Sequence, residues 1–395
     1  MVLSPYSPGA GVTPPVLAGR DAELTAAQAL LGRTAAFGRP APAPLILTGS
    51  RGVGKTVILR AMAANAREVR FIAVELSADG ASSLPHRLAE RIAEALRPDS
   101  TRTAKWEAWR DRLRSFSIEV SIAGVVKVGG SVQAEAASSV GRDALVDLLD
   151  RTAGLAKERG YAGLALFLDE LQEAPRQQLV VITNTFQDAL GGSSSPLVVV
   201  GADLPALPDR LMEAGSFAER FDYRLLRRLS DAAASHALLE PAHAVGVHWS
   251  SAAAGHVLAE ANGFPYLLQL FGDASWNSAQ PERGVAIGRP DAERGVTCAL
   301  QRLDEGMFRG RWNKATPQER KLFEAVARVC DEEGVASTGE VAQHMGKQTK
   351  ALSMSRAGLI DKGLLEAPSR GTLSFTMPGF ERFVLDQAQG DADRS

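Results

Sequence analysis

Cysteine is scarce in this chain of 395 residues, and its scarcity excludes several classes of protein. Two cysteines, Cys298 and Cys330, cannot supply the disulfide framework of a small secreted domain. They have no neighbouring Cys or His at a metal-ligand spacing, and the six histidines form no ligand cluster. We therefore interpret both cysteines as reduced thiols and expect a cytoplasmic protein.

Long apolar runs and an excess of charge of one sign are also missing. No stretch approaches the roughly 18 apolar residues that a membrane-spanning helix needs, so we expect no membrane association. The formal net charge is −2, so binding to nucleic acid would require a local basic patch. The hydrophobic share of 45% is enough for a sizeable core, and the length favours two or three domains.

The N-terminus contains neither the basic start nor the apolar run of a signal peptide. Residues 1–15 are rich in Pro, Gly and Ser, and we expect them to be disordered. Ordered structure is expected from Val16, with a first helix over residues 22–31. The short apolar run Leu45-Ile46-Leu47 follows a proline-rich break and predicts a buried strand.

Apolar strands and amphipathic helices alternate over the next part of the chain. This order is typical of a parallel α/β sheet with covering helices. The predicted strands cover residues 45–47, 70–76, 164–168 and 196–200, and the predicted helices cover 55–67, 84–96, 142–159 and 179–190. Between two of these helices, Ile118, Val120 and Ile122 alternate with polar residues, which predicts a hairpin or ribbon inserted at about residues 115–135.

The second half of the chain is predicted to be helical up to Arg311, with a boundary at Trp312-Asn313. Beyond that boundary the pattern predicts three helices, at 317–330, 338–345 and 351–362. Two short strands, at 364–366 and 373–375, follow them. Three helices and a two-stranded ribbon outline a winged helix, and a generic small α+β module is the alternative interpretation.

A glycine-rich loop carries the clearest chemistry in the sequence. It fits the pattern G-x-x-x-x-G-K-[ST] at every fixed position: Gly49-Ser50-Arg51-Gly52-Val53-Gly54-Lys55-Thr56. Glycines let backbone N–H groups surround phosphates, and a helix beginning at Lys55 would add its positive end. We expect Lys55 to reach the β- and γ-phosphates of ATP and the Thr56 hydroxyl to bind Mg²⁺.

Two adjacent carboxylates, Asp169 and Glu170, end the most uniform apolar run of the chain. The carboxyl end of a buried parallel strand lies near the phosphate loop in this architecture. We expect Asp169 to hold Mg²⁺ through water and Glu170 to act as the general base that activates the attacking water. The alternative is that both residues merely cap the following helix.

On these motifs the chain resembles the AAA+ ATPases, and among them the origin-recognition branch. The loop at 49–56 and the segment 164–170 resemble the Walker A and Walker B motifs, and the segment 16–24 resembles the box that lines the adenine pocket. The resemblance implies adenine contacts for Leu17 and Arg20. It also implies that Arg220 contacts the γ-phosphate of a neighbouring subunit; a surface or salt-bridged arginine is the alternative.

Two family features are altered in this sequence. After the strand ending at Val200, Asp203 is the one polar residue near the position where the family places a sensor. The later sensor helix lacks its usual arginine and reads Gly263-Phe264-Pro265-Tyr266 instead. This resembles signalling P-loop ATPases, which implies that Pro265 packs near the adenine; a helix-start proline is the alternative. Loss of both sensors implies slow hydrolysis, which suits a switch.

The predicted fold class is α/β, a P-loop AAA+ parallel-sheet core with a helical lid and a winged-helix-like C-terminal module. The predicted divisions are a disordered N-terminus (1–15), a nucleotide-binding core (16–224) with the ribbon insert (about 115–135), a lid (225–311), the winged-helix-like domain (312–388) and a tail (389–395).

Three functions remain open at this level. The first is an ATP-switched protein that binds duplex DNA through the helix at 351–362, near which Lys347, Lys350, Arg356, Lys362 and Arg370 gather against Asp361 and Glu366. The second is a switch of protein assembly, in a homo-oligomer or with a protein partner. It is favoured by the absence of net positive charge over residues 313–395. The third, a small-molecule kinase, leaves Glu170 and the C-terminal module unexplained.

Overall fold

A computed structural model describes residues 2–9, 11–79, 82–96, 131–192, 194–205, 207–331, 334–377 and 379–392. They form two compact bodies. The core body comprises Arg20–Gly49 and Lys55–Leu226, and the C-terminal body comprises Met1–Gly19, Ser50–Gly54 and Arg227–Ser395. The division at Leu226 falls two residues after the predicted end of the nucleotide-binding core. No helix within the described ranges is long and apolar enough to cross a membrane.

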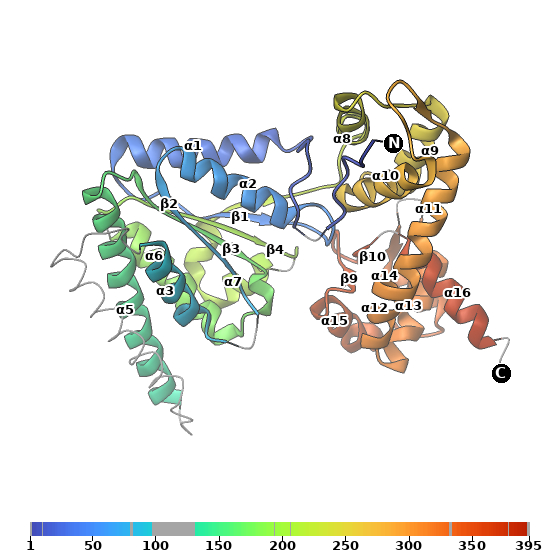
Figure 1. Cartoon of the computed structure of the whole chain (residues 1–395). Coiled ribbons are helices and arrows are strands. Elements are labelled where there is room, and N and C mark those ends of the chain that lie inside the picture. The colour runs from blue at the N-terminus through green and yellow to red at the C-terminus, as the bar shows by residue number, and fades with distance from the viewer. Residues whose placement is uncertain are drawn as a thin grey trace. The chain divides into compact units, whose positions relative to one another are not determined.

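A five-stranded parallel sheet forms the centre of the core body (Figure 1). Its spatial order is β2-β3-β4-β1-β5, with β1 at Leu45–Thr48, β2 at Phe71–Ser77, β3 at Gly163–Asp169, β4 at Leu197–Asp203 and β5 at Asp222–Leu225. Every residue of β1, β3 and β4 is buried. Strands covered on both faces need continuous apolar sequence, which explains why their runs were recognisable.

Helices cover both faces of this sheet (Figure 1). Their bounds are α1 at Asp21–Phe37, α2 at Lys55–Glu68, α3 at Leu84–Ala95, α5 at Ser131–Glu158, α6 at Arg176–Gly191 and α7 at Leu207–Ala214. The core body also contains two short 3₁₀ helices. η1 at Leu171–Glu173 connects β3 to α6, and η2 at Ser216–Arg220 connects α7 to β5. The parallel-sheet core predicted from the alternating pattern is confirmed.

Two strand assignments differ from the prediction. β4 continues three residues past Val200 to Asp203, because it pairs with β1 as far as Thr48. β5 lies in a stretch expected to be helical. Its sequence Asp-Tyr-Arg-Leu is half exposed and lacks an apolar run, so only pairing with β1 at the sheet edge makes it a strand.

The predicted ribbon at about residues 115–135 falls mostly outside the described residues. Where description resumes, Ser131 begins the 28-residue helix α5. The last five residues assigned to the ribbon are therefore helical.

The first half of the C-terminal body is a helical bundle, the predicted lid. It contains α8 at Asp231–Ala244, α9 at Ser251–Ala261, α10 at Pro265–Ala279 and α11 at Arg289–Leu303, with β6 at His248–Trp249 pairing β7 at Ala286–Ile287. Ser230 and Ser250 cap α8 and α9 by accepting the amide N–H three residues on. A short π-helix (η3, Asp304–Phe308) and α12 (Arg309–Lys314) follow α11.

The N-terminal segment packs on this bundle, so the prediction that residues 1–15 are disordered is wrong for its first part. Tyr6 is 5% exposed, its hydroxyl donates to the Leu238 carbonyl, and Trp249 Nε1 donates to the same hydroxyl at 2.9 Å. A Cβ at Gly272 of α10 would lie 3.0 Å from the Tyr6 ring, so the glycine leaves room for this ring against the helix. Trp276 Nε1 also donates to the Val2 carbonyl and the Ser7 N–H to Gln269 Oε1, contacts that a Pro- and Gly-rich composition does not reveal.

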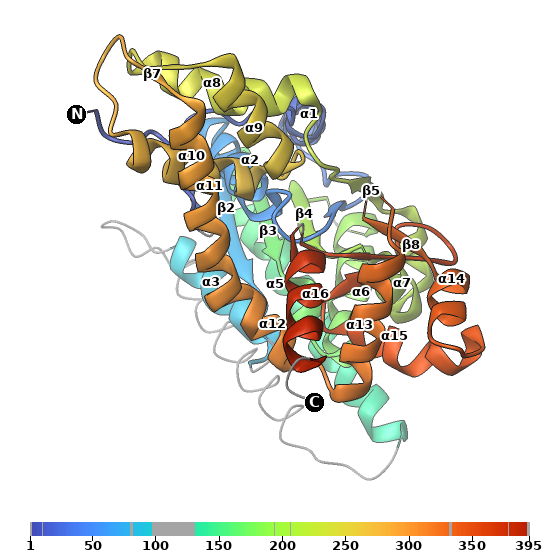
Figure 2. The same ribbon diagram turned by 90° about the vertical axis from the view of Figure 1, so that its right-hand side faces the viewer.

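The second half of the C-terminal body is a small α+β module. Its elements are α13 at Pro317–Val329, β8 at Val335–Ser337, α14 at Thr338–His344, η4 at Thr349–Leu352, α15 at Ser353–Asp361, β9 at Leu365–Glu366, β10 at Thr372–Phe375 and α16 at Phe380–Ala392. The antiparallel sheet has the order β8-β10-β9. Figure 2 shows α16 beside α13. The rings of Phe323, Phe375 and Phe380 contact one another in tilted and edge-to-face arrangements and are buried in the module.

This module contains the three predicted helices and both predicted strands, and adds β8 and α16. Because α16 runs to Ala392, residues 389–392 are helical and are not part of a tail, contrary to the prediction. The Phe380, Phe383 and Val384 side chains are buried, which explains why the helix forms.

Candidate functional site

The phosphate-loop motif connects β1 to α2, as predicted. Gly52 and Gly54 have φ angles of 84° and 94°, in the left-handed region that favours glycine. A Cβ at Gly54 would meet nothing within 4 Å, so its requirement is conformational. Such a loop, followed at once by a 14-residue helix, turns backbone N–H groups toward an anion.

Lys55 lies at the start of α2, and its Nζ donates to the Gly49 carbonyl at 2.7 Å. The lysine is thus folded back over its own loop. Its ammonium and the positive end of α2 place two sources of positive potential at the same point. This arrangement can bind a phosphate group.

Thr56 and Asp169 meet although 113 residues separate them in sequence. The Thr56 hydroxyl donates to Asp169 Oδ2 at 2.6 Å. Asp169 is only 8% exposed, and this burial raises its pKa, against the lowering effect of the Thr56 hydrogen bond. A buried carboxylate gains from a nearby cation, and two hard oxygen ligands suit Mg²⁺. The residues therefore fit the predicted metal.

Glu170 follows directly, with its backbone in the left-handed region at φ 53° and ψ 37°. Its N–H donates to Asp169 Oδ1 at 2.9 Å. A non-glycine residue held in this conformation is strained by roughly 1–2 kcal/mol, and such strain is concentrated at functional sites. This left-handed conformation turns the chain sharply at the end of β3, where Asp169 and Glu170 place two successive carboxylates.

The middle of the phosphate loop is packed within the C-terminal body. Ser50 Oγ donates to Glu366 Oε1 in β9 at 3.2 Å, and the Tyr266 N–H donates to the Gly52 carbonyl at 3.3 Å. Burial lowers the pKa of Arg311 to about 10, and the charge of Arg51 contributes in the same direction. Both the lid and the C-terminal module therefore contact residues 50–52.

Pro265 is the first residue of α10, as the helix-start interpretation expected, and its neighbours Phe264 and Tyr266 approach Gly52. The structure thus brings the Gly263–Tyr266 segment to the phosphate loop. Leu17 is half-buried in the same body. Their predicted contacts with adenine remain predictions.

Two arginines singled out by the family resemblance differ in environment. Arg20 is 5% exposed, and burial lowers its pKa. Arg220 ends η2 and is exposed, with its guanidinium 5.9 Å from the centre of the Phe217 ring. Arg220 is therefore accessible at the surface of the core body, whereas Arg20 is packed inside it. Its predicted contact with a neighbouring subunit remains a prediction.

Asp203, the sensor candidate, lies at the carboxyl end of β4 and is completely buried. Its Oδ1 accepts the Leu204 N–H, and its Oδ2 has no hydrogen-bond partner within the described part of the chain. Burial raises the pKa of Asp203 to about 8, while the Lys55 charge acts in the opposite direction. The carboxyl is therefore largely protonated at neutral pH, beside the phosphate loop that β1 carries.

Replacing Asp203 with Asn should stabilise the protein, and more at pH 8 than at pH 5. The folded-state pKa lies above the unfolded value of about 3.9, so the native state binds the extra proton. Stability from this group is present below pH 4 and lost as pH rises to about 8. Asparagine stays neutral, so the gain should reach the order of a few kcal/mol at pH 8.

Thermal melts at both pH values check this prediction. Asp209 is an exposed aspartate in the first turn of α7, six residues after Asp203, so Asp209→Asn is the matched control and should change little. An Asp203→Asn gain that is equal at the two pH values would show that the carboxyl does not titrate in this window.

Sequence reasoning missed two residues beside Glu170. Gln172 Nε2 donates to Glu170 Oε2. Arg210 in α7 donates to the carbonyls of Gln172 and Ala174, at 2.7 and 3.1 Å. No motif contains either residue, and the pairing of α7 with η1 exists only in three dimensions.

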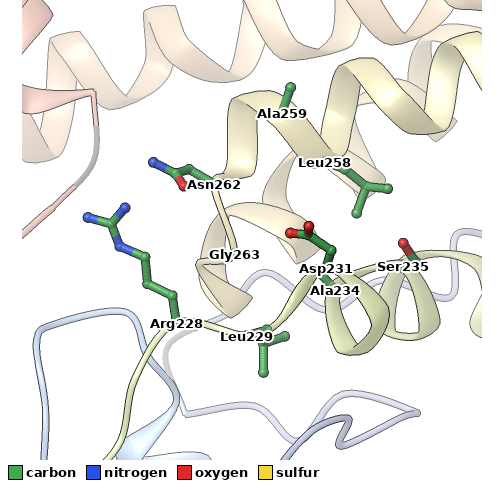
Figure 3. Close-up of a pocket in the computed structure, with 9 residues that line it drawn as sticks. All are labelled: Arg228, Leu229, Asp231, Ala234, Ser235, Leu258, Ala259, Asn262 and Gly263. Atoms are coloured by element: carbon green, nitrogen blue, oxygen red, sulfur yellow. The ribbon is translucent and has the colours of Figure 1, made fainter. Parts of the chain in front are cut away.

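A separate pocket of about 390 Å³ lies in the lid, between the start of α8 and the end of α9 (Figure 3). Arg228 and Asn262 lie on one side of it and Asp231 and Ser235 on the other. The Arg228 guanidinium lies 4.6 Å from the centre of the Phe264 ring. No residue of the phosphate loop lines this pocket, so it is distinct from the motif-bearing site.

The sheet order, the phosphate loop and the carboxylates after β3 define a P-loop ATPase with an AAA+ fold. Residues 16–200 match the family described as AAA ATPase domain. Residues 305–384 match a family described as a domain of unknown function. No curated protein matches the chain.

Two solved structures resemble almost the whole chain. The Walker-type ATPase of Pyrococcus abyssi has a TM-score of 0.59 at 12% identity, covering 93% of this chain and 96% of its own. The ORC2 protein of Aeropyrum pernix has a TM-score of 0.58 at 14% identity, covering 98% of each chain. Identities this low establish a shared fold alone, and the predicted P-loop AAA+ fold is confirmed.

Proposed function

We propose that this protein is a Mg²⁺-dependent ATPase that works as a slow, nucleotide-controlled switch on duplex DNA. The observation that carries the nucleotide part is the hydrogen bond between Thr56 and Asp169. It joins the end of the phosphate loop to the carboxylates after β3, which sequence alone left far apart. In this proposal Gly49–Thr56 hold the triphosphate and Lys55 neutralises the β- and γ-phosphates.

Thr56 and Asp169 are the residues that would hold Mg²⁺, which when bound supplies positive charge for the phosphate oxygens. Glu170 takes a proton from the attacking water. The similar ORC2 structure contains ADPNP and ADP, which supports adenine nucleotides as ligands here. The absence of an arginine in Gly263–Tyr266 supports slow turnover, and the exposed Arg220 supports completion of the site by a second copy.

The DNA part depends on the C-terminal module, which we interpret as a winged helix with α15 as the recognition helix. The order helix, strand, two helices and two strands is that of the winged-helix class. Lys347, Lys350 and Arg370 are exposed around α15 and the β9–β10 turn. These three side chains can contact phosphates.

One residue counted in the basic cluster has another role. Lys362 Nζ lies 2.6 and 2.8 Å from the two carboxylate oxygens of Glu319, whose side chain is only 8% exposed. Glu319 also accepts the Thr316 N–H in a capping box that begins α13. Lys362 is thus a structural ion pair, and the basic face is smaller than the sequence count suggested.

Titration of a fluorescent duplex at several salt concentrations, with ATP, ADP or no nucleotide, tests the proposal. We expect binding that is strongest with ATP and falls with salt. Replacing Lys347, Lys350 and Arg370 together with Ala should reduce the slope of log K against log salt by about 3, roughly one for each lost phosphate contact.

Lys321→Ala is the matched control, because Lys321 is an exposed lysine of the same module on α13. Its slope should stay at the wild-type value. Absence of duplex binding in every nucleotide state would reject the DNA part and favour the second candidate, a switch of protein assembly. The net charge of the module supports that second candidate, because 11 basic and 12 acidic residues lie between 313 and 395.

A further inference from the structure

The 3₁₀ helix η1, directly after Glu170, is fixed from two sides. Leu171 is 2% exposed, and a Cβ built on Gly201 of β4 would come within 3.3 Å of its side chain. On the other side, Arg210 donates one hydrogen bond to the Gln172 carbonyl and one to the Ala174 carbonyl. Hydrogen bonds from a charged donor are among the stronger ones in proteins. The backbone at Gln172 is therefore a rigid support.

The Gln172 side chain points from this support to the Glu170 carboxylate. Its Nε2 donates to Glu170 Oε2. The amide end facing a carboxylate must be the NH₂ group, so the oxygen Oε1 faces elsewhere. That Oε1 is buried and has no hydrogen-bond partner among the residues the structure describes. A buried acceptor that lacks a donor destabilises the folded state, which points to a function for this oxygen.

We propose that Gln172 is a positioning residue for hydrolysis: it fixes the Glu170 carboxylate and, through Oε1, the attacking water. This inference rests on the proposed ATPase function. A water that donates one hydrogen to Glu170 and the other to Gln172 Oε1 keeps its lone pair for attack. The water oxygen bonds to the γ-phosphorus, the bond to the β,γ-bridging oxygen breaks, its electron pair leaves with ADP, and Glu170 receives the proton.

Gln172→Met tests the inference, because methionine has nearly the same length and volume but offers neither donor nor acceptor of comparable strength. We expect kcat to fall 10- to 100-fold, with KM for ATP and the Kd of a fluorescent ATP analogue within twofold of wild type. Gln172→Glu, which keeps an acceptor but repels Glu170, should also lower kcat. Gln177→Met, at an exposed position of α6, is the control.

The double variant Glu170→Gln/Gln172→Met separates positioning from a structural role. Because Gln172 acts with Glu170 on the same water, the rate loss of the double variant should be much smaller than the product of the two single losses. Fully multiplicative losses would overturn the inference. So would a Gln172→Met variant with wild-type kcat, or one that loses ATP affinity and thermal stability together with kcat.

The two proposals fail in different ways. A wild-type protein without hydrolysis, or one indifferent to Glu170→Gln, would remove the ATPase proposal and this inference with it. Hydrolysis that requires Glu170 but is unchanged by Gln172→Met would remove the inference alone.

Discussion

Replacing Lys55 with Ala should weaken ATP binding by roughly 100-fold or more. Lys55 is the one ammonium in the phosphate loop, and we expect it to make two charge-assisted hydrogen bonds to phosphates, each contributing about 1.5–3 kcal/mol. In the structure its Nζ donates to the carbonyl of Gly49, within its own loop. The fold should therefore survive, and the loss should be confined to nucleotide binding.

Titration with a fluorescent ATP analogue measures the change. A second readout is the thermal shift on adding ATP, which depends on the ratio of ligand concentration to Kd and should nearly vanish in the variant. Lys157→Ala removes an exposed lysine from α5 of the same body and should bind ATP like wild type. Equal affinities in wild type and Lys55→Ala would reject the phosphate-loop assignment.

The second large effect is expected from Glu170→Gln, which should lower kcat by roughly 100- to 10,000-fold and leave ATP affinity unchanged. Glutamine cannot accept the proton of the attacking water, although it fills the same space beside Gln172. The phosphate contacts come from other residues, so binding should persist. Such a variant would hold ATP and serve as a trap for DNA or protein partners.

Phosphate release under single-turnover conditions measures the chemical step directly. Glu173→Gln is the closest control, because Glu173 is an exposed carboxylate two residues beyond Leu171 in the same 3₁₀ helix. It should turn over ATP like wild type. If Glu170→Gln and Glu173→Gln behaved alike, the general-base assignment would have to be abandoned.

The parallel core was predictable from sequence because its strands are buried on both faces and read as unbroken apolar runs. β5 was not predictable for the opposite reason. Its four residues lie at the sheet edge, none of them is buried, and they include Asp222 and Arg224. The N-terminal segment was misjudged because composition averages over residues, whereas a buried tyrosine and a few hydrogen bonds to distant residues hold it on the bundle.

The charged residues of the C-terminal module show a related limit. Counting Lys362 with its neighbours gave a larger basic patch than the structure presents, because Glu319 lies 43 residues away in sequence and 2.6 Å away in space. Sequence patterning reports which residues carry charge. It does not report which charges are already neutralised by a partner from another element.

By itself, the sequence predicted the phosphate loop and the Asp169-Glu170 pair, because each motif is local and lies where the chain turns. The tertiary structure decided how these parts meet and what surrounds them. Thr56 reaches Asp169, Arg210 fixes the support of Gln172, and Asp203 holds a proton at neutral pH. Each of these three properties depends on burial and on partners from distant segments, and none of them is encoded in a short stretch of sequence.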